Sequence, residues 1–93
     1  MKLLSIVKCK LILEKPPTKY EMFKMMRSDL IMICNFLLNL KLSKLEAERF
    51  EAIRYCSRLS EAVVLGLQKS SQSLCYRALH EAALHINRNN NHI

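Results

Sequence analysis

The segment HEAALH, from His80 to His85, carries the residue types of a helical zinc site. In the zinc motif H-E-x-x-H, two histidines four residues apart lie on one face of a helix and bind the same ion. Here the histidines are five residues apart, so the second imidazole points about 140° away from the first around a helix. We therefore predict no metal site in this segment. Either histidine could instead be a pH-sensitive contact in an interface.

Other arrangements that support catalysis are absent from the sequence. The serines fall in predicted helix caps and linkers, where their hydroxyls bond to the backbone. The glutamates of residues 44–68 have basic neighbours on a predicted solvated face, which is the wrong setting for a raised carboxylate pKa. A phosphate-binding loop needs several glycines, and the chain has one, Gly66. We expect a protein that is not an enzyme and has no cofactor, no metal and no small-molecule substrate.

The four cysteines stand alone in the sequence, at Cys9, Cys34, Cys56 and Cys75. The absence of a C-x-x-C pair disfavours a zinc ribbon. The first residues, MKLLSIVKCKLILEK, begin like a secretory signal, but Lys8 and Lys10 interrupt the apolar region and no small-residue cleavage site follows. Thiols in the cytosol stay reduced. The sequence therefore predicts four small buried apolar side chains and a cytoplasmic location.

Composition indicates the fold class. The chain has 93 residues with one glycine and two prolines, which disfavours barrels and sandwiches and predicts an all-α protein. At this size only about 60–65% of the unfolded surface is buried on folding, and such chains often gain stability by oligomerising or by docking on a partner. The longest apolar run, Leu30–Leu40, has 11 residues, against roughly 20 in a membrane-spanning helix. Neither a transmembrane segment nor a membrane partner is expected.

Three helices are predicted, at about residues 19–40, 44–68 and 73–87. Each has candidate N-cap residues: Thr18 with Glu21 as a capping box, Ser43 with Glu46 as a second box, and Ser71 or Ser73 after the linker QKSSQS. Each also has an apolar stripe: Phe23, Met26, Leu30, Ile33, Leu37 and Leu40; then Leu45, Ala52, Cys56, Leu59 and Val63; then Leu74, Cys75, Ala78, Leu79, Ala82 and Ile86. These stripes predict a small three-helix bundle, or a helical hairpin plus a third helix.

The segments on either side of this single helical domain, residues 19–87, are predicted to lie outside the bundle. Residues 1–18 form a basic N-terminal arm. Between residues 7 and 14 its apolar side chains mostly alternate with charged ones, at the period of a strand, so the arm could be a short strand, a helix or irregular. Residues 88–93, rich in asparagine, are predicted to be a disordered tail.

The second half of the first predicted helix indicates a binding function. It is apolar on nearly every side, and a chain this small cannot bury all of it. We predict a small helical regulator or adaptor that acts by binding another protein, as a homodimer. The expected partner-binding residues lie off the main stripe, where methionine suits an adaptable surface: Met22, Met25, Met32 and Phe36.

Two alternatives depend on the basic arm. The first is a nucleic-acid-associated regulator that neutralises phosphates with Lys8, Lys10, Lys15, Lys19, Lys24 and Arg27. These are mostly lysines, which suit phosphate contacts better than base reading. The second places the arm on an anionic membrane as an amphipathic helix, with Leu3, Leu4, Val7 and Leu11 facing the lipid. Lys8 and Lys10 fit that arrangement poorly, so it ranks last.

Overall fold

The computed structural model describes residues 2–90 of the chain, and it describes side chains for residues 7–88. Residues 2–90 contain six helices and no strand, which confirms the all-α prediction. The helices are α1 (Lys2–Glu14), α2 (Lys19–Phe23), α3 (Arg27–Leu38), α4 (Lys44–Arg49), α5 (Ala52–Val64) and α6 (Gln68–Asn90). No helix in this described range is long and apolar enough to cross a membrane.

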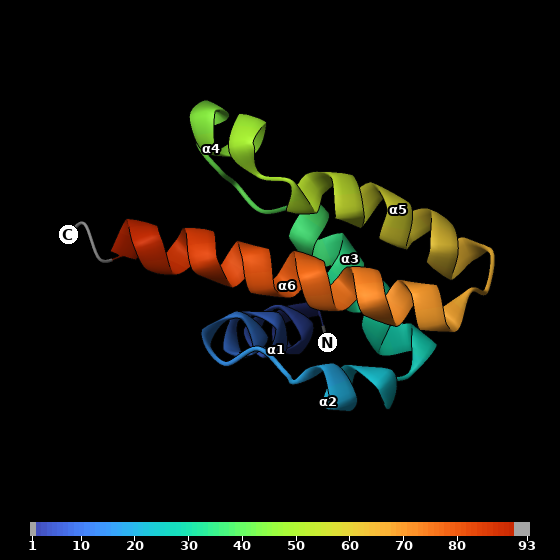
Figure 1. The fold of residues 1–93 in the computed structure, drawn as a ribbon. Helices are drawn as coiled ribbons and strands as arrows, with labels where there is room; N and C mark the ends of the chain where they lie inside the picture. The colour runs from blue at the N-terminus through green and yellow to red at the C-terminus, as the bar shows by residue number, and fades with distance from the viewer. Residues whose placement is uncertain (1, 91–93) are drawn as a thin grey trace.

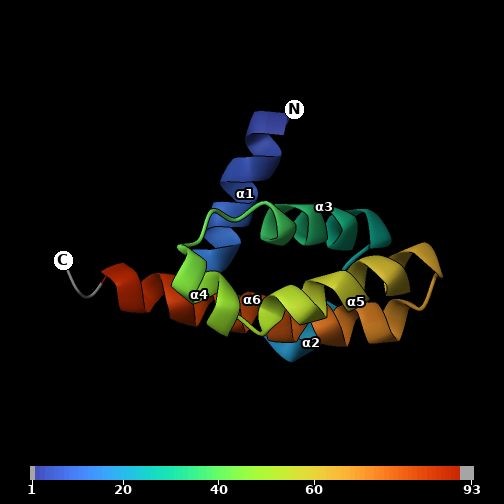
Figure 2. The same cartoon turned by 90° about the horizontal axis from the view of Figure 1, so that it is seen from above.

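Helix α6 is the centre of the fold, and α1, α2, α3 and α5 all pack against it. In Figure 1 α5 lies above α6, α3 lies behind it, and α1 and α2 lie below. Figure 2, seen from above, shows α1 running across the direction of α6, with its N-terminal end pointing away from α4 and α5. With 23 residues, α6 is about 35 Å long, close to the longest dimension of the molecule, 39 Å. Because of this length, α6 can contact helices from both ends of the chain.

Helices α5 and α6 form a tight antiparallel hairpin. Gly66 ends α5 with a φ of 76°, in the left-handed region that favours glycine. The Leu67 amide donates to the Ala62 carbonyl and the Gly66 amide to the Val63 carbonyl, at 2.9 and 3.1 Å, which is the pattern of a Schellman motif. The facing surfaces are buried and rich in small side chains: Ala52, Cys56, Leu59, Val63, Cys75, Ala78, Leu79 and Ala82. These small residues let the two helix axes come close.

The predicted helix 19–40 is wrong in one respect, because the chain breaks it into α2 and α3. Met26 is extended, with φ −76° and ψ 154°, and this interrupts the helix. The Phe23 and Met25 carbonyls just before it therefore accept no hydrogen bond from an amide one turn further along a helix. Side chains of α6 replace those partners. The Gln72 Nε2 atom donates to the Phe23 carbonyl at 2.8 Å and to the Met25 carbonyl at 3.4 Å, and the Gln68 Nε2 atom donates to the Met25 carbonyl at 3.3 Å.

The predicted helix 44–68 is likewise divided, into α4 and α5. Phe50 is extended, with φ −85° and ψ 91°, and its ring is buried edge-on against His85 at 5.1 Å between centroids. The Glu51 amide donates to the Glu81 carboxylate at 3.0 Å. Contacts with α6 therefore hold the break, and Leu45, predicted to lie on the buried stripe, is exposed on α4.

The third predicted helix, 73–87, is longer at both ends. Helix α6 begins at Gln68, so QKSSQS is helical rather than a linker. The Ser71 hydroxyl donates to the Leu67 carbonyl at 2.8 Å, one turn back along the helix, instead of capping. Residues 88–90 of the predicted tail are helical, and residues 91–93 lie outside the described residues.

Residues 2–14 of the predicted arm form the helix α1 rather than a strand. Cys9 and Leu13, four residues apart, are buried, and α1 packs against α3 and α6. Those neighbours are helices and offer no strand edge, so a strand would leave its amides and carbonyls unpaired, whereas a helix pairs its own. The alternating apolar residues between 7 and 14 are divided between the two faces of this helix: Cys9 and Leu13 are buried, whereas Val7 and Leu11 are exposed.

Candidate functional site

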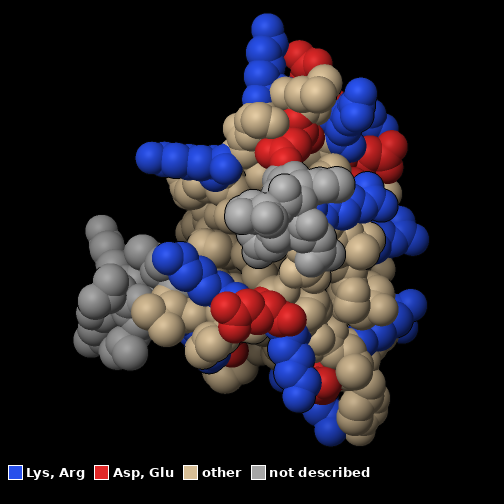
Figure 3. Space-filling view, turned by 90° about the vertical axis from the view of Figure 1, so that its left-hand side faces the viewer, with Lys and Arg blue, Asp and Glu red and all other residues tan. Residues whose placement is uncertain are grey.

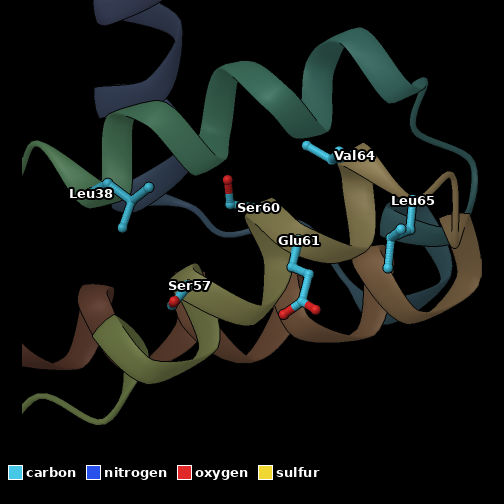
Figure 4. Close-up of a pocket in the computed structure, with 6 residues that line it drawn as sticks. All are labelled: Leu38, Ser57, Ser60, Glu61, Val64 and Leu65. Carbon is cyan, nitrogen blue, oxygen red and sulfur yellow. The ribbon is translucent and has the colours of Figure 1, made fainter.

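A hollow in the described surface lies between α3 and α5. Figure 4 shows Leu38 of α3 pointing toward α5, while Ser60 and Val64 of α5 point toward α3. Glu61 and Leu65 extend from the other side of α5 and form its outer rim. The hollow has a volume of about 510 Å³. We call this hollow and the one next to it the α3–α5 groove.

The second hollow continues the groove toward the start of α3. Its volume is about 250 Å³, and it shares Ser60 and Val64 with the first. It is lined by Arg27, Ile31, Cys34, Asn35, Ser60, Val63 and Val64. The groove therefore follows the two helices for most of their length.

The residue types of the groove follow from helix spacing. Ile31 and Leu38 are seven residues apart on α3, and Ser57 and Val64 are seven apart on α5, so each pair lies on one flank of its helix. Val64 is 75% exposed and Leu38 is 47% exposed. Because Ser57 and Ser60 are small, another helix could approach α5 closely. The groove offers apolar contact along its length, with hydroxyl and amide groups between.

The thiols beneath the groove are unsuited to nucleophilic chemistry. The Cys34 Sγ atom donates to the Cys56 carbonyl at 3.6 Å. Burial raises the pKa of Cys34, and burial together with the nearby Cys34 thiol raises the pKa of Cys56 to about 12. Burial also raises the pKa values of Cys9 and Cys75. All four cysteines are free and buried, which confirms the prediction that they act as small apolar side chains.

The two histidines of HEAALH face different neighbours. The His80 Nε2 atom lies 3.3 Å from the Pro17 carbonyl, and its ring lies 4.3 Å from the Tyr76 ring. His85 instead packs on Phe50 between α4 and α5. This divergence matches the five-residue spacing. Within the described residues no group of three or more His, Cys, Asp or Glu side chains could hold a metal.

The structure does not gather the four predicted partner-binding residues into one surface. Met22 is fully buried in the core, so its assignment to a docking surface is wrong: the break after α2 turns it inward. Met25 and Phe36 are half-buried against the same core. Met32 is half-buried, one turn before Phe36 on α3, on the flank away from Ile31 and Leu38.

The six residues predicted for phosphate contacts are all exposed: Lys8, Lys10, Lys15, Lys19, Lys24 and Arg27. Two of them lie near aromatic rings. The Lys24 Nζ atom is 4.2 Å from the centroid of the Tyr20 ring, and the Lys19 Nζ atom is 6.0 Å from that of Phe23. The structure therefore places these cations on α1 and α2, on the connection between them, and at the start of α3.

Apart from Arg27, which was predicted to contact phosphate, the residues that form the groove were not among the predicted site residues. One signal in the sequence could have found them: Val63, Val64 and Leu65 are consecutive, and a helix that buries one stripe must expose part of such a run. Leu65 is 64% exposed. The position of Ile31 and Leu38 beside this run depends on how α3 packs against α5, which helix spacing alone does not give.

Comparison with protein-family models, curated proteins and solved structures found no match for this chain. Its residues and geometry are therefore the basis for assigning a function. The α3–α5 groove combines exposed apolar side chains with two charged residues, Arg27 at the start of α3 and Glu61 on the outer rim of α5. Such a surface can bind a macromolecule by apolar contact and select it by charge.

Proposed function

We propose that this chain is a small non-enzymatic helical adaptor or regulator that acts by binding another protein through the α3–α5 groove. The observation that supports this proposal is the exposure of Leu38, Val64 and Leu65 along one continuous hollow. Exposed apolar residues scattered singly need no explanation, but a patch that lines a groove is typical of an interaction site.

The proposed occupant is an amphipathic helix of the partner. Helix α3 has 12 residues and is about 18 Å long, which matches roughly three turns of an incoming helix. Such a helix would present apolar anchors at spacings of three, four and seven residues. Ile31 and Leu38 would contact it from α3 and Val64 from α5.

Homodimer formation is part of this proposal. Without a partner, a second copy of the chain covers the exposed Val64 and Leu38 through its own groove, in a two-fold symmetric contact. The partner helix then displaces that copy, so the two states exclude each other. The cytoplasm is the proposed location, since free, buried thiols at Cys9, Cys34, Cys56 and Cys75 suit a reducing compartment.

The experiment compares charged substitutions inside and outside the groove. Leu38→Glu and Val64→Glu each place a carboxylate in the apolar contact. Leu84→Glu is the matched control, because Leu84 is 57% exposed on α6 and does not line the groove. Sedimentation velocity measures the mass of each variant. Affinity capture followed by mass spectrometry identifies what each one binds.

We expect the wild type and Leu84→Glu to be dimers and to capture the same protein. Both groove variants should be folded monomers that lose it. A photo-cross-linking residue at position 64 should then link to a helix of that protein with the expected apolar spacing. Groove variants that remain dimeric and still capture the protein would refute the proposal.

A further inference from the structure

The exposed face of α1 has an apolar centre with cations on both sides. Val7 and Leu11, one turn apart, are exposed, while Cys9 and Leu13 are buried on the other face. Around the helix axis, Lys8 lies about 60° from Leu11 on one side, and Lys10 lies about 60° from Val7 on the other. In the sequence these lysines seemed to interrupt an apolar segment. In the helix they flank an apolar stripe, which ends at the exposed Glu14, seven residues after Val7.

Helix α2 and the residues after it repeat this combination. Tyr20 and Met26 are each 69% exposed, and Phe23 is also exposed. Lys19 and Lys24 lie beside the two aromatic rings. Aromatic residues with an apolar body and lysines with long aliphatic chains are the residue types found where a protein meets the lipid headgroup region.

The two helices are on the same side of α6. Figure 1 shows α1 and α2 below α6, opposite α5. Residues 7–27 hold the six exposed cations and two acids, Glu14 and Glu21. The Glu21 carboxylate is already occupied, because it accepts a hydrogen bond from the Thr18 amide at 3.2 Å. Figure 3 shows Lys and Arg side chains at the lower end of the molecule, with acidic side chains among them.

We propose that this face, the exposed side chains of α1 and α2 with Met26 and Arg27, docks on the surface of an anionic lipid membrane. Helix α1 lies in the plane of the headgroups, with Val7 and Leu11 in the acyl boundary and Lys8 and Lys10 extending to lipid phosphates. The contact is peripheral. It shares Arg27 with the α3–α5 groove and uses none of the other residues that line that groove.

Lipid fits this face better than nucleic acid. Cations alone suffice for phosphate contacts along a duplex, whereas here Val7, Leu11 and Met26 are exposed among them. Stacking of a base would use the Tyr20 ring, and the Lys24 ammonium already lies over one face of it at 4.2 Å. An anionic membrane uses both properties of the surface, its charge and its apolar centre.

The test is co-sedimentation of the full chain with vesicles of phosphatidylcholine, with and without phosphatidylserine. Leu11→Ser with Met26→Ser removes the apolar contact, and Lys8→Gln with Lys10→Gln removes two charges. Leu45→Ser with Leu84→Ser, and Lys41→Gln with Lys44→Gln, are matched controls, because these residues are exposed and lie outside both proposed binding surfaces. Circular dichroism checks that every variant folds.

We expect binding only to vesicles that contain phosphatidylserine. Each lost lysine should weaken it about fivefold, the apolar pair should weaken it by at least about tenfold, and the controls should not change it. No binding to these vesicles, or equal losses in the controls, would overturn the proposal. Binding to duplex DNA that depends on Lys8 and Lys10 but not on Leu11 and Met26 would overturn it in favour of nucleic acid.

Discussion

Helix α6 has two different neighbours, α5 on one side and the α1–α2 pair on the other. Against α5 it forms a long interface in which small side chains such as Ala52, Cys56, Ala78 and Ala82 are fully buried. Against α1 and α2 it packs with fewer buried side chains, and the main ones are Leu13 of α1 and Met22 of α2. The outward faces of α1 and α2 carry apolar side chains among lysines. The comparison indicates that the helices with the largest buried interface, α5 and α6, are not the helices that carry the apolar side chains among lysines, α1 and α2.

The largest expected effect is on the α5–α6 side. Leu59 is fully buried, so Leu59→Ala leaves a cavity and should lower the free energy of unfolding by about 2–5 kcal/mol. Leu11→Ala removes the same atoms from an exposed site on α1 and should change the free energy of unfolding by less than about 0.5 kcal/mol. Urea denaturation followed by circular dichroism measures both. Equal losses would mean that the two sides of α6 are equally important for stability.

A middle-sized effect is expected where α6 holds the break between α2 and α3. Gln72→Leu removes the donor to the Phe23 and Met25 carbonyls and leaves the Phe23 carbonyl without its part-buried hydrogen bond, which should lower the free energy of unfolding by about 1–3 kcal/mol. Hydrogen exchange should accelerate at the amides of α2 more than at those of α5.

The control for this prediction is Gln68→Leu. Gln68 is exposed and makes one longer hydrogen bond to the same loop, so the expected loss is below about 0.5 kcal/mol. If both variants accelerate exchange in α5 as strongly as in α2, the α1–α2 side is not a separate unit.

The smallest effect appears only at alkaline pH. Burial, together with the neighbouring Cys34 thiol, raises the pKa of the Cys56 thiol from 9.0 to about 12. Above pH 9 the unfolded chain loses this proton while the folded chain keeps it, so the stabilisation is complete below pH 9 and is lost as pH rises toward 12. Urea denaturation as a function of pH should show a decline that is shallower in Cys56→Ala. If Cys56→Ala shows an identical decline, the loss of stability above pH 9 comes from titrating groups other than Cys56.

The two capping boxes in the sequence were reliable signals. Both capping boxes are present: the Glu21 amide donates to the Thr18 hydroxyl, and the Glu46 amide donates to the Ser43 hydroxyl, each at 3.2 Å. A capping box involves residues three apart, so it can be read from sequence alone. The helical class and the burial of the cysteines were predicted for a similar reason, since both follow from composition and short-range spacing.

The breaks could not be predicted in this way. The break before α3 depends on Gln72, 49 residues after the Phe23 carbonyl to which it donates. The break before α5 depends on Phe50 packing on His85. No short-range pattern encodes such distant partners, and periodicity alone joined each pair of helices. For the same reason Met22 was placed on a surface, and the groove residues Leu38 and Val64 were not identified.

The position of α6 also affects how the chain assembles during synthesis. A ribosome makes α6 after α1, α2, α3 and α5, yet all four helices pack against it. Until α6 emerges, the apolar faces that contain Leu13, Met22 and Leu59 lack their main cover. The nascent protein therefore completes its core only when α6 has been translated, and during that interval the early helices are exposed to chaperones or to any surface near the ribosome.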